Sequence, residues 1–358
     1  MCTNNRNPLH CILPPHVLAH IAKNGNSLGA RSAAVDTLVH DAHQRSMRLL
    51  QSAVSTSATR LAQTLRAGIN PLGPQITVMD GKSQEVTSGP ILRTANTGPS
   101  DDQDAEQAFK GLNATWDFYN AIYERNSIDN AGMPINAVVH YGSLYDNAFW
   151  DGTEMVFGDG DGVTFTHFTK CIDVIGHELT HGVTQTDLGL IYQGQSGALN
   201  ESISDIFGSM IKQYDAKQST ADADWLIGQG LLLHDPKVAL RSMKNPGSAY
   251  KNDPVLGNDP QPKNMKDYIK TGQDNGGVHL NSGIPNYAFF LIADGMGGFS
   301  WQKAGQIWYN TLRDNRLKPN ATFSEFASRT IANAITLYGA DSKEVSIVQD
   351  SWAKVGVS

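Results

Sequence analysis

Hydrophobic and polar positions follow two different periodicities along this chain. Between about residues 73 and 162, short apolar segments such as 75–79 and 135–141 alternate with polar residues and are bounded by Asp, Gly, Asn and Pro. This alternation is typical of β-strands. Within the same part, apolar residues recur at helical spacing over 104–125, which predicts a helix with a buried stripe. The N-terminal part is therefore expected to combine strands and helix.

Beyond Cys171 the pattern becomes mainly helical. Four segments near the C-terminus repeat their apolar residues every three or four positions: 286–293, 301–312, 323–338 and 343–355. Together the two patterns predict an α+β fold with a β-rich N-terminal lobe and a mainly α-helical C-terminal lobe. We expect a binding site in the cleft between the lobes, since such boundaries favour one.

Residues 1–50 form a separate small unit in this pattern. Pro14 and Pro15 precede apolar positions at helical spacing, which predicts a helix that begins at a proline, and 33–39 predict a second helix. The stretch 51–59 is small and polar, which is typical of an exposed connector. We therefore divide the chain into three parts: 1–50, 51–185 and 186–358. One interpretation of the first part is a helical decoration without a regulatory role.

Composition narrows the classes of partner. The formal net charge is −7 and the pI is near 5.8, so no basic stripe for nucleic acid is present. No run of apolar residues approaches the roughly eighteen needed to span a membrane. Three cysteines are too few and too widely spaced for a disulfide framework, although they leave one bridge open. A small molecule or another polypeptide is the expected partner.

One motif carries chemistry, the run His177-Glu178-Leu179-Thr180-His181. Residues four apart share a helix face, so His177 and His181 can bind one metal ion with Glu178 beside it. Catalytic zinc takes three protein ligands and keeps a position for water. Glu201, on a segment with helical apolar spacing, is the candidate third ligand. The alternative, an amphipathic helix with solvated histidines, is disfavoured by this second segment.

Further residues fit around such an ion. Asp205 follows Glu201 by one helical turn and can accept a hydrogen bond from a ligand imidazole, which fixes its tautomer. Zinc lowers the pKa of bound water to about 7 and polarises a carbonyl under attack. Glu178 is best placed to take the proton of that water and pass it to a leaving amine.

Six ordered blocks of sequence resemble the thermolysin family of zinc metallopeptidases. They are 147–152, 158–162, 177–181, 200–205, 240–243 and 274–283, and the resemblance covers most of the chain after about residue 70. The leader before it, with Pro14-Pro15-His16-Val17-Leu18, is similar to the protealysin subgroup, which has a short propeptide.

The resemblance implies a thermolysin-like, two-lobed zinc endopeptidase made as a precursor. Its own propeptide would cover the cleft as an intramolecular inhibitor and be removed near residues 50–70. Protein or peptide substrates would be cut on the amino side of bulky hydrophobic residues. We expect a monomer with Zn²⁺ as the cofactor.

The resemblance also assigns roles to single residues. Tyr192 and His279 correspond to donors that stabilise the transition state, and Asp274 to the carboxylate that orients and charges the histidine. Taken alone, His279 would be a surface or packed histidine. The substrate main chain would be bound by Asn147, Ala148 and Arg241. The side-chain pocket would be lined by Phe165, Phe168, Val174 and Leu240, for which membership of the core is the alternative.

The sequence departs from the family at its paired calcium site. The carboxylate that precedes the first histidine is present as Asp173, but Lys212 stands where the family has a glutamate. An ammonium group cannot bind calcium and can instead pair with Asp173. We therefore expect this site to be lost, while Asp215, Asp222 and Asp224 leave room for another calcium contact.

Two further questions stay open at the level of sequence. The N-terminus lacks the apolar stretch of a secretory signal peptide, yet the family is largely extracellular, so we expect secretion, with a cytoplasmic location as the alternative. A thiol of Cys2 or Cys11 that blocks the zinc is a minor hypothesis.

Two other functions compete with an endopeptidase. A catalytically inactive binding protein is disfavoured by the intact motif. An exopeptidase would need an acidic cluster near Asn147 and Ala148, and none is present.

Overall fold

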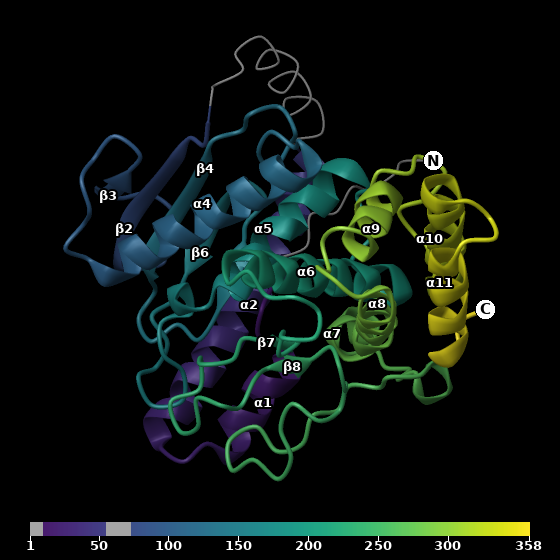
Figure 1. The fold of residues 1–358 in the computed structure, drawn as a ribbon. Coiled ribbons are helices and arrows are strands. Elements are labelled where there is room, and N and C mark those ends of the chain that lie inside the picture. The colour runs from purple at the N-terminus through teal and green to yellow at the C-terminus, as the bar shows by residue number, and fades with distance from the viewer. Residues whose placement is uncertain (1–9, 55–72) are drawn as a thin grey trace.

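The computed structural model describes residues 10–54 and 73–358. Most of the predicted processing region and Cys2 lie outside these ranges. The described part contains one six-stranded sheet in the order β1-β5-β6-β4-β2-β3 and a largely helical second half, as Figure 1 shows. The strands are β1 (His10–Cys11), β2 (Ile76–Gln84), β3 (Ile91–Thr94), β4 (Ile135–Tyr141), β5 (Ala148–Trp150) and β6 (Glu154–Phe157).

The leader supplies one edge strand of this sheet. β1 pairs antiparallel with β5, with His10 opposite Trp150 and Cys11 opposite Phe149. β5 is antiparallel to β6, whereas β6, β4 and β2 run parallel and β3 closes the far edge antiparallel to β2. The leader is therefore hydrogen-bonded into the N-terminal lobe at β5, where the sheet would otherwise end.

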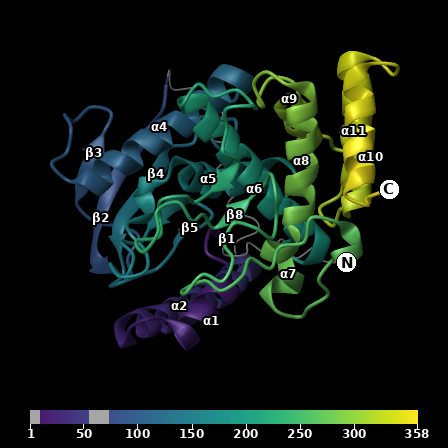
Figure 2. The same ribbon diagram turned by 60° about the horizontal axis from the view of Figure 1, so that its bottom comes forward.

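Two leader helices continue from this strand. α1 (Pro15–Asn24) begins at a proline, as predicted, and α2 (Leu28–Val54) packs against it. Figures 1 and 2 show the two helices side by side, below α5 and α6 in Figure 1. α2 continues past residue 50, so the expected boundary falls inside a helix. Six leader residues join the main apolar core: Ile12, Leu13, Val17, Leu18, Ile21 and Ala34.

Two long helices cross the middle of the molecule. α5 (Ile172–Asp187) packs closely against α6 (Gly194–Asp215), and α4 (Gln103–Tyr123) contacts both. Glycines permit the close approach. A Cβ on Gly176 would lie 2.7 Å from the Ile211 side chain, and one on Gly208 would lie 2.4 Å from the Asp173 carbonyl oxygen. This spacing brings the residues of the two helices into direct contact.

The C-terminal lobe is helical, in agreement with the predicted pattern. It contains α7 (Asp274–Asn281), α8 (Gly283–Met296), α9 (Ala304–Leu312), α10 (Phe323–Tyr338) and α11 (Lys343–Lys354). Short elements connect these parts: η1 (Phe168–Lys170), η2 (Met265–Asp267), β7 (Leu226–Ile227) and β8 (Arg241–Ser242). In the described ranges, no helix combines the length and the apolar character needed to cross a bilayer.

Candidate metal centre and peptide cleft

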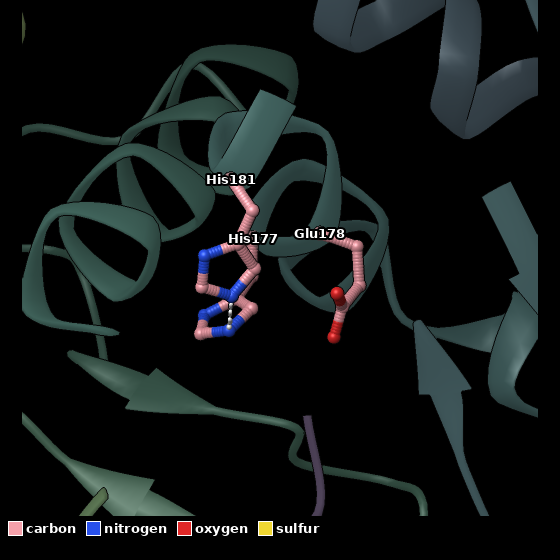
Figure 3. Close-up of side chains that lie close together, drawn as sticks. All are labelled: His177, Glu178 and His181. Atoms are coloured by element: carbon pink, nitrogen blue, oxygen red, sulfur yellow. Dashed lines mark hydrogen bonds between the residues drawn. The ribbon is translucent and has the colours of Figure 1, made fainter. Parts of the chain in front are cut away.

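Three side chains from α5 and α6 converge at the centre of the molecule. The Nε2 atoms of His177 and His181 are 3.0 Å apart, and the Glu201 carboxylate oxygens lie 3.5 Å from the first and 3.6 Å from the second. Figure 3 shows both rings directed to the same point, with Glu178 beside them. A tetrahedral ion with bonds of about 2.0–2.2 Å would space its ligand atoms about 3.3 Å apart. The observed spacing suits such an ion.

Hydrogen bonds behind the rings determine which nitrogens face the centre. The Nδ1 atom of His177 lies 2.9 Å from Asp205 Oδ1, and that of His181 lies 2.8 Å from Asn200 Oδ1. If both Nδ1 atoms carry the proton, both Nε2 atoms direct lone pairs at each other. One Glu201 oxygen is buried there without a hydrogen-bond partner. Two lone pairs and a buried carboxylate fit a divalent cation such as Zn²⁺.

Glu178 lies beside this centre and is fully buried. Its Oε2 accepts a hydrogen bond from the Trp150 backbone N–H at 3.1 Å, while Oε1 has no partner. Burial raises the pKa of this carboxyl well above its ordinary value, and the negative charge of Glu201 raises it further. A carboxylate with a raised pKa is suited to accept a proton and release it again.

Asp205 joins the metal centre to the peptide-binding groups. Besides His177, it accepts two hydrogen bonds from Arg241, both at 2.8 Å, and one from Asn286 at 2.9 Å. Burial alone would raise the pKa of Asp205, but the Arg241 guanidinium and His177 hold it below its ordinary value. Arg241 and His177 therefore share one buried anionic anchor.

A second group of side chains lies next to the metal centre and contacts Glu201. It consists of Tyr192, His279 and Asp274. His279 Nδ1 is 2.6 Å from Asp274 Oδ1, and Tyr192 OH donates to Glu201 and lies 3.4 Å from His279 Nε2. Burial would lower the pKa of His279, but the Asp274 carboxylate and Glu201 raise it to about 9. At neutral pH this histidine is therefore a cation that donates through Nε2.

The leader occupies the cleft with its main chain. His279 Nε2 lies 3.1 Å from the Cys11 carbonyl oxygen. Ile12 donates its N–H to the Ala148 carbonyl at 3.3 Å and accepts from Arg241 at 3.0 Å. Leu13 donates its N–H to Asn147 Oδ1 at 3.0 Å. The groups predicted to bind a substrate main chain thus contact two consecutive leader residues, and the predicted transition-state donor His279 contacts the residue before them.

The Cys11 thiol belongs to a different environment from its carbonyl. Its side chain lies in a small apolar cluster with Tyr141, Tyr145, Phe149 and Val156. The group next to His279 is the backbone carbonyl, so the leader enters the cleft as a peptide strand. A cavity of about 160 Å³ remains at this point, lined by Cys11, Leu13, Pro15, Tyr192, Asp274, Asn275 and His279.

Several contacts were not found by sequence reasoning. Asp41 of α2 accepts hydrogen bonds from Asn147 Nδ2 at 3.0 Å and from Tyr145 OH at 2.5 Å. Thr37 accepts from the Asp146 backbone N–H at 3.1 Å. Nothing near Asp41 in the sequence signals this role, because its partners lie more than 100 positions away. By contrast, Asn200 directly precedes the candidate ligand Glu201. This position in the sequence could have indicated its contact with His181.

Comparison with protein families agrees with this geometry. The sequence profile of the thermolysin metallopeptidase catalytic domain matches residues 33–185, and that of the thermolysin metallopeptidase alpha-helical domain matches residues 188–357. The chain belongs to the thermolysin family of metallopeptidases. The thermolysin-like fold and the class of zinc metalloendopeptidase, both predicted from the sequence, are confirmed by this membership.

Full-length relatives support the same assignment. The "Extracellular metalloprotease" of Pectobacterium carotovorum subsp. carotovorum is 46% identical over 98% of this chain and 97% of its own length. The "Protease PrtS" of Photorhabdus sp. (strain Az29) is 43% identical over 97% and 91%. The solved structure of the protealysin precursor, a metalloproteinase from Serratia proteamaculans, is 45% identical, covers 98% of this chain and 100% of its own, and superimposes with a TM-score of 0.86.

Lys212, where the sequence is expected to depart from the thermolysin family, lies against two carboxylates. Lys212 Nζ lies 3.2 Å from Asp173 Oδ2 and 2.9 Å from Asp224 Oδ1, and it donates to the Leu226 carbonyl at 2.6 Å. Burial would lower the pKa of Lys212, but Asp173 and Asp224 raise it. An ammonium group thus lies between two carboxylates.

The four residues expected around the side-chain pocket are all buried. Phe165, Phe168, Val174 and Leu240 belong to the same apolar core as the leader residue Ile12. A larger cavity of about 550 Å³ lies elsewhere, between α4, η1 and the end of α6. It contacts none of the metal-centre residues.

Proposed function

We propose that this chain is the precursor of a zinc endopeptidase whose metal is held by His177, His181 and Glu201. The observation that carries the proposal is the convergence of two imidazole nitrogens and a buried carboxylate within 3.0–3.6 Å of one another. Asp205 orients His177 through its Nδ1 atom, as carboxylates behind metal-binding histidines do.

The catalytic roles follow from position and charge. When bound, zinc lowers the pKa of water to about 7 and polarises a carbonyl. Glu178 takes the proton of the attacking water and delivers it to the leaving amine, for which its burial and raised pKa suit it. Tyr192 and protonated His279 donate to the developing oxyanion, and Asp274 keeps His279 charged.

The leader indicates how a substrate lies in the cleft. A peptide would add to β5 as an extra strand, bound by Ala148 and Asn147 on one side and Arg241 on the other. The residue in the place of Ile12 follows the bond to be cut, because the preceding carbonyl faces His279. Ile12 is fully buried and apolar, which favours cleavage on the amino side of bulky hydrophobic residues. We assign the pocket to Phe165, Phe168, Val174 and Leu240.

An endopeptidase explains the cleft better than an exopeptidase does. The leader continues on both sides of the Cys11–Ile12 peptide bond, with His10 paired to Trp150 and Leu13 bound to Asn147. A site for a free amino terminus would have to end the chain at this point. The complete set of metal-binding and donor groups likewise disfavours an inactive binding protein.

The remaining parts of the proposal concern maturation and surroundings. The leader, residues 1–50 with the rest of α2, acts as an intramolecular inhibitor until it is cut in the connector that follows. The mature enzyme comprises the two lobes 51–185 and 186–358 without the α2 and connector residues that are lost in processing, and acts as a monomer on protein or peptide substrates. We propose that the protein is secreted, which the name of its extracellular relative supports, and that the Lys212 ion pairs replace the paired calcium site.

Substitution of Glu178 tests the proposal directly. We expect the Glu178→Ala precursor to keep one zinc per chain. Once another protease has removed its leader, it should hydrolyse casein at least about 100-fold more slowly than the processed parent, because the proton acceptor is gone. Metal analysis and a casein assay measure the two effects. Near-normal hydrolysis would refute the role of Glu178, and absence of zinc from the parent protein would refute the metal site.

A further inference from the structure

A second group of histidine and aspartate side chains lies outside the cleft. It gathers where the start of α4 meets the end of β4 and the loop between β6 and η1. Three segments far apart in the sequence contribute to it, and none of its members takes part in the proposed peptide hydrolysis. The members are Asp102, Asp104, His140, Asp159 and His167.

Three of these residues have the spacing of metal ligands. His167 Nδ1 lies 2.8 Å from Asp104 Oδ2 and 3.5 Å from Asp159 Oδ1, and one ligand atom from each of the three lies within 4.8 Å of the others. The zinc ligands of the cleft are 3.0–3.6 Å apart. The Nδ1 atom of His167 is buried and makes no hydrogen bond, although a carboxylate oxygen lies within reach. A cation shared by the three side chains would need its ligand atoms this close together.

The same three ligands are backed by further polar groups. Thr169 donates to Asp104 Oδ1 at 2.6 Å, which leaves Oδ2 directed at His167. His140 Nδ1 lies 2.9 Å and 3.0 Å from the two Asp159 oxygens, and its Nε2 lies 2.9 Å from Asp102. In the cleft, Asp205 and Asn200 hold the zinc-binding rings in a comparable way. Groups that fix the ligands in place are a general feature of metal sites.

The charge of the group also calls for a cation. Three carboxylates face two imidazoles, so one negative charge is left over even if both imidazoles are protonated. Within the described chain, no lysine or arginine forms an ion pair with any of the three aspartates. A divalent ion would compensate this charge and join the segments.

We propose that Asp104, Asp159 and His167 bind a second divalent ion, of the transition-metal class. One imidazole and two carboxylates suit Zn²⁺ or Mn²⁺, whereas Ca²⁺ takes oxygen ligands alone. The His167 side chain is 45% exposed, which leaves room for water in the remaining positions. The ion would connect the start of α4 to the loop that leads through η1 into the zinc-binding helix α5.

Metal titration of the full-length Glu178→Ala precursor tests the site. This variant cannot digest itself, and its zinc content is first measured as one per chain. Addition of MnCl₂, followed by electron paramagnetic resonance, and of ZnCl₂, followed by calorimetry, is expected to reveal one further equivalent. His167→Ala should weaken this second binding step at least tenfold and leave the first zinc in place. Mn²⁺ should raise the Tm of the parent and not that of His167→Ala.

Matched variants separate a built site from unspecific binding. His234→Ala removes another half-buried histidine, which contacts a single carboxylate, Asp253, at 2.8 Å, and should leave the second step unchanged. Asp159→Asn should weaken it like His167→Ala. The proposal is overturned if millimolar metal gives no second equivalent, or if the second equivalent persists in both His167→Ala and Asp159→Asn. Absence of the first zinc would instead contradict the proposed function.

Discussion

The metal centre and the leader meet in one cleft but are held there by different forces. The centre is made by two helices adjacent in sequence, with fully buried ligands and polar groups fixed behind each ring. The leader reaches the same point from more than 100 residues away, through main-chain hydrogen bonds and a few side-chain contacts. The metal centre is therefore suited to stay intact during maturation, and the leader can be released without disturbing it.

The largest expected effect is on the metal centre and comes from Asp205. Asp205→Ala leaves the buried Arg241 guanidinium without its partner, which costs about 3–5 kcal/mol in the free energy of unfolding. Loss of the hydrogen bond to His177 should also weaken zinc binding about 10- to 100-fold. Urea unfolding and chelator competition measure the two effects.

A surface pair provides the control for Asp205. Glu344→Ala removes an exposed ion pair with Lys303 and should cost about 1 kcal/mol or less. If Asp205→Ala lowered the free energy of unfolding no more than Glu344→Ala does, the metal centre would not be held more firmly than the surface.

Acid should loosen the leader before it affects the fold. Burial lowers the pKa of His16 from 6.5 to about 4 in the docked leader, and its Nδ1 atom makes no hydrogen bond within the described residues. Docking is therefore at full strength above pH 6.5 and weakens as the pH falls towards 4, by about tenfold per unit and about 3 kcal/mol in total. The hydrolysis rate of the precursor, divided by that of the mature enzyme at each pH, measures this loss.

Two variants sharpen the acid experiment. His16→Gln cannot be protonated and should flatten the pH dependence between 6.5 and 4. His20→Gln, one turn further along α1, should keep it. The same pH dependence in both variants would show that a group other than His16 controls the release of the leader.

Asp41 should have a smaller effect, confined to the leader. Asp41→Ala removes the acceptor for Asn147 and Tyr145, which should weaken docking by about 1–3 kcal/mol, or roughly tenfold or more in the residual activity of fresh precursor. Asp36→Ala is the matched control, because Asp36 lies on the same helix and accepts a hydrogen bond from Ser32 of that helix. Equal activity of the two variants would remove Asp41 from the inhibitory contacts.

The smallest effect concerns the ion pairs next to the zinc helix. Lys212→Glu supplies a third carboxylate beside Asp173 and Asp224, so its Tm should rise with added Ca²⁺ by the equivalent of about 1 kcal/mol or more. In the parent, Ca²⁺ should not raise the Tm by binding between Asp173 and Asp224. A comparable rise with Ca²⁺ in the parent, retained in Asp173→Asn, would place its calcium site elsewhere.

Particular residues show how far the sequence could be interpreted. The period-two segment 135–141 is β4, and the helical stripe of 104–125 is α4 within two residues at each end. Helices expected at 323–338 and 343–355 are α10 and α11. These elements could be predicted because each carries its own periodicity. The division at residue 50 stays a prediction, and α2 continues past it to Val54.

The sequence by itself determined the chemistry of the centre. The four-residue spacing of His177 and His181 places both on one helix face, and Glu201 and Asp205 repeat that spacing on the next helix, so the candidate ligands could be named from local patterns, while the packing of α5 on α6 brings them together.

Only the tertiary structure decided which residues from distant parts of the chain meet. The docking of Ile12 against Arg241, the contact of Asp41 with Asn147, and the meeting of Asp104 with His167 all join residues tens to hundreds of positions apart. No local period encodes such contacts, because they arise from the packing of whole elements.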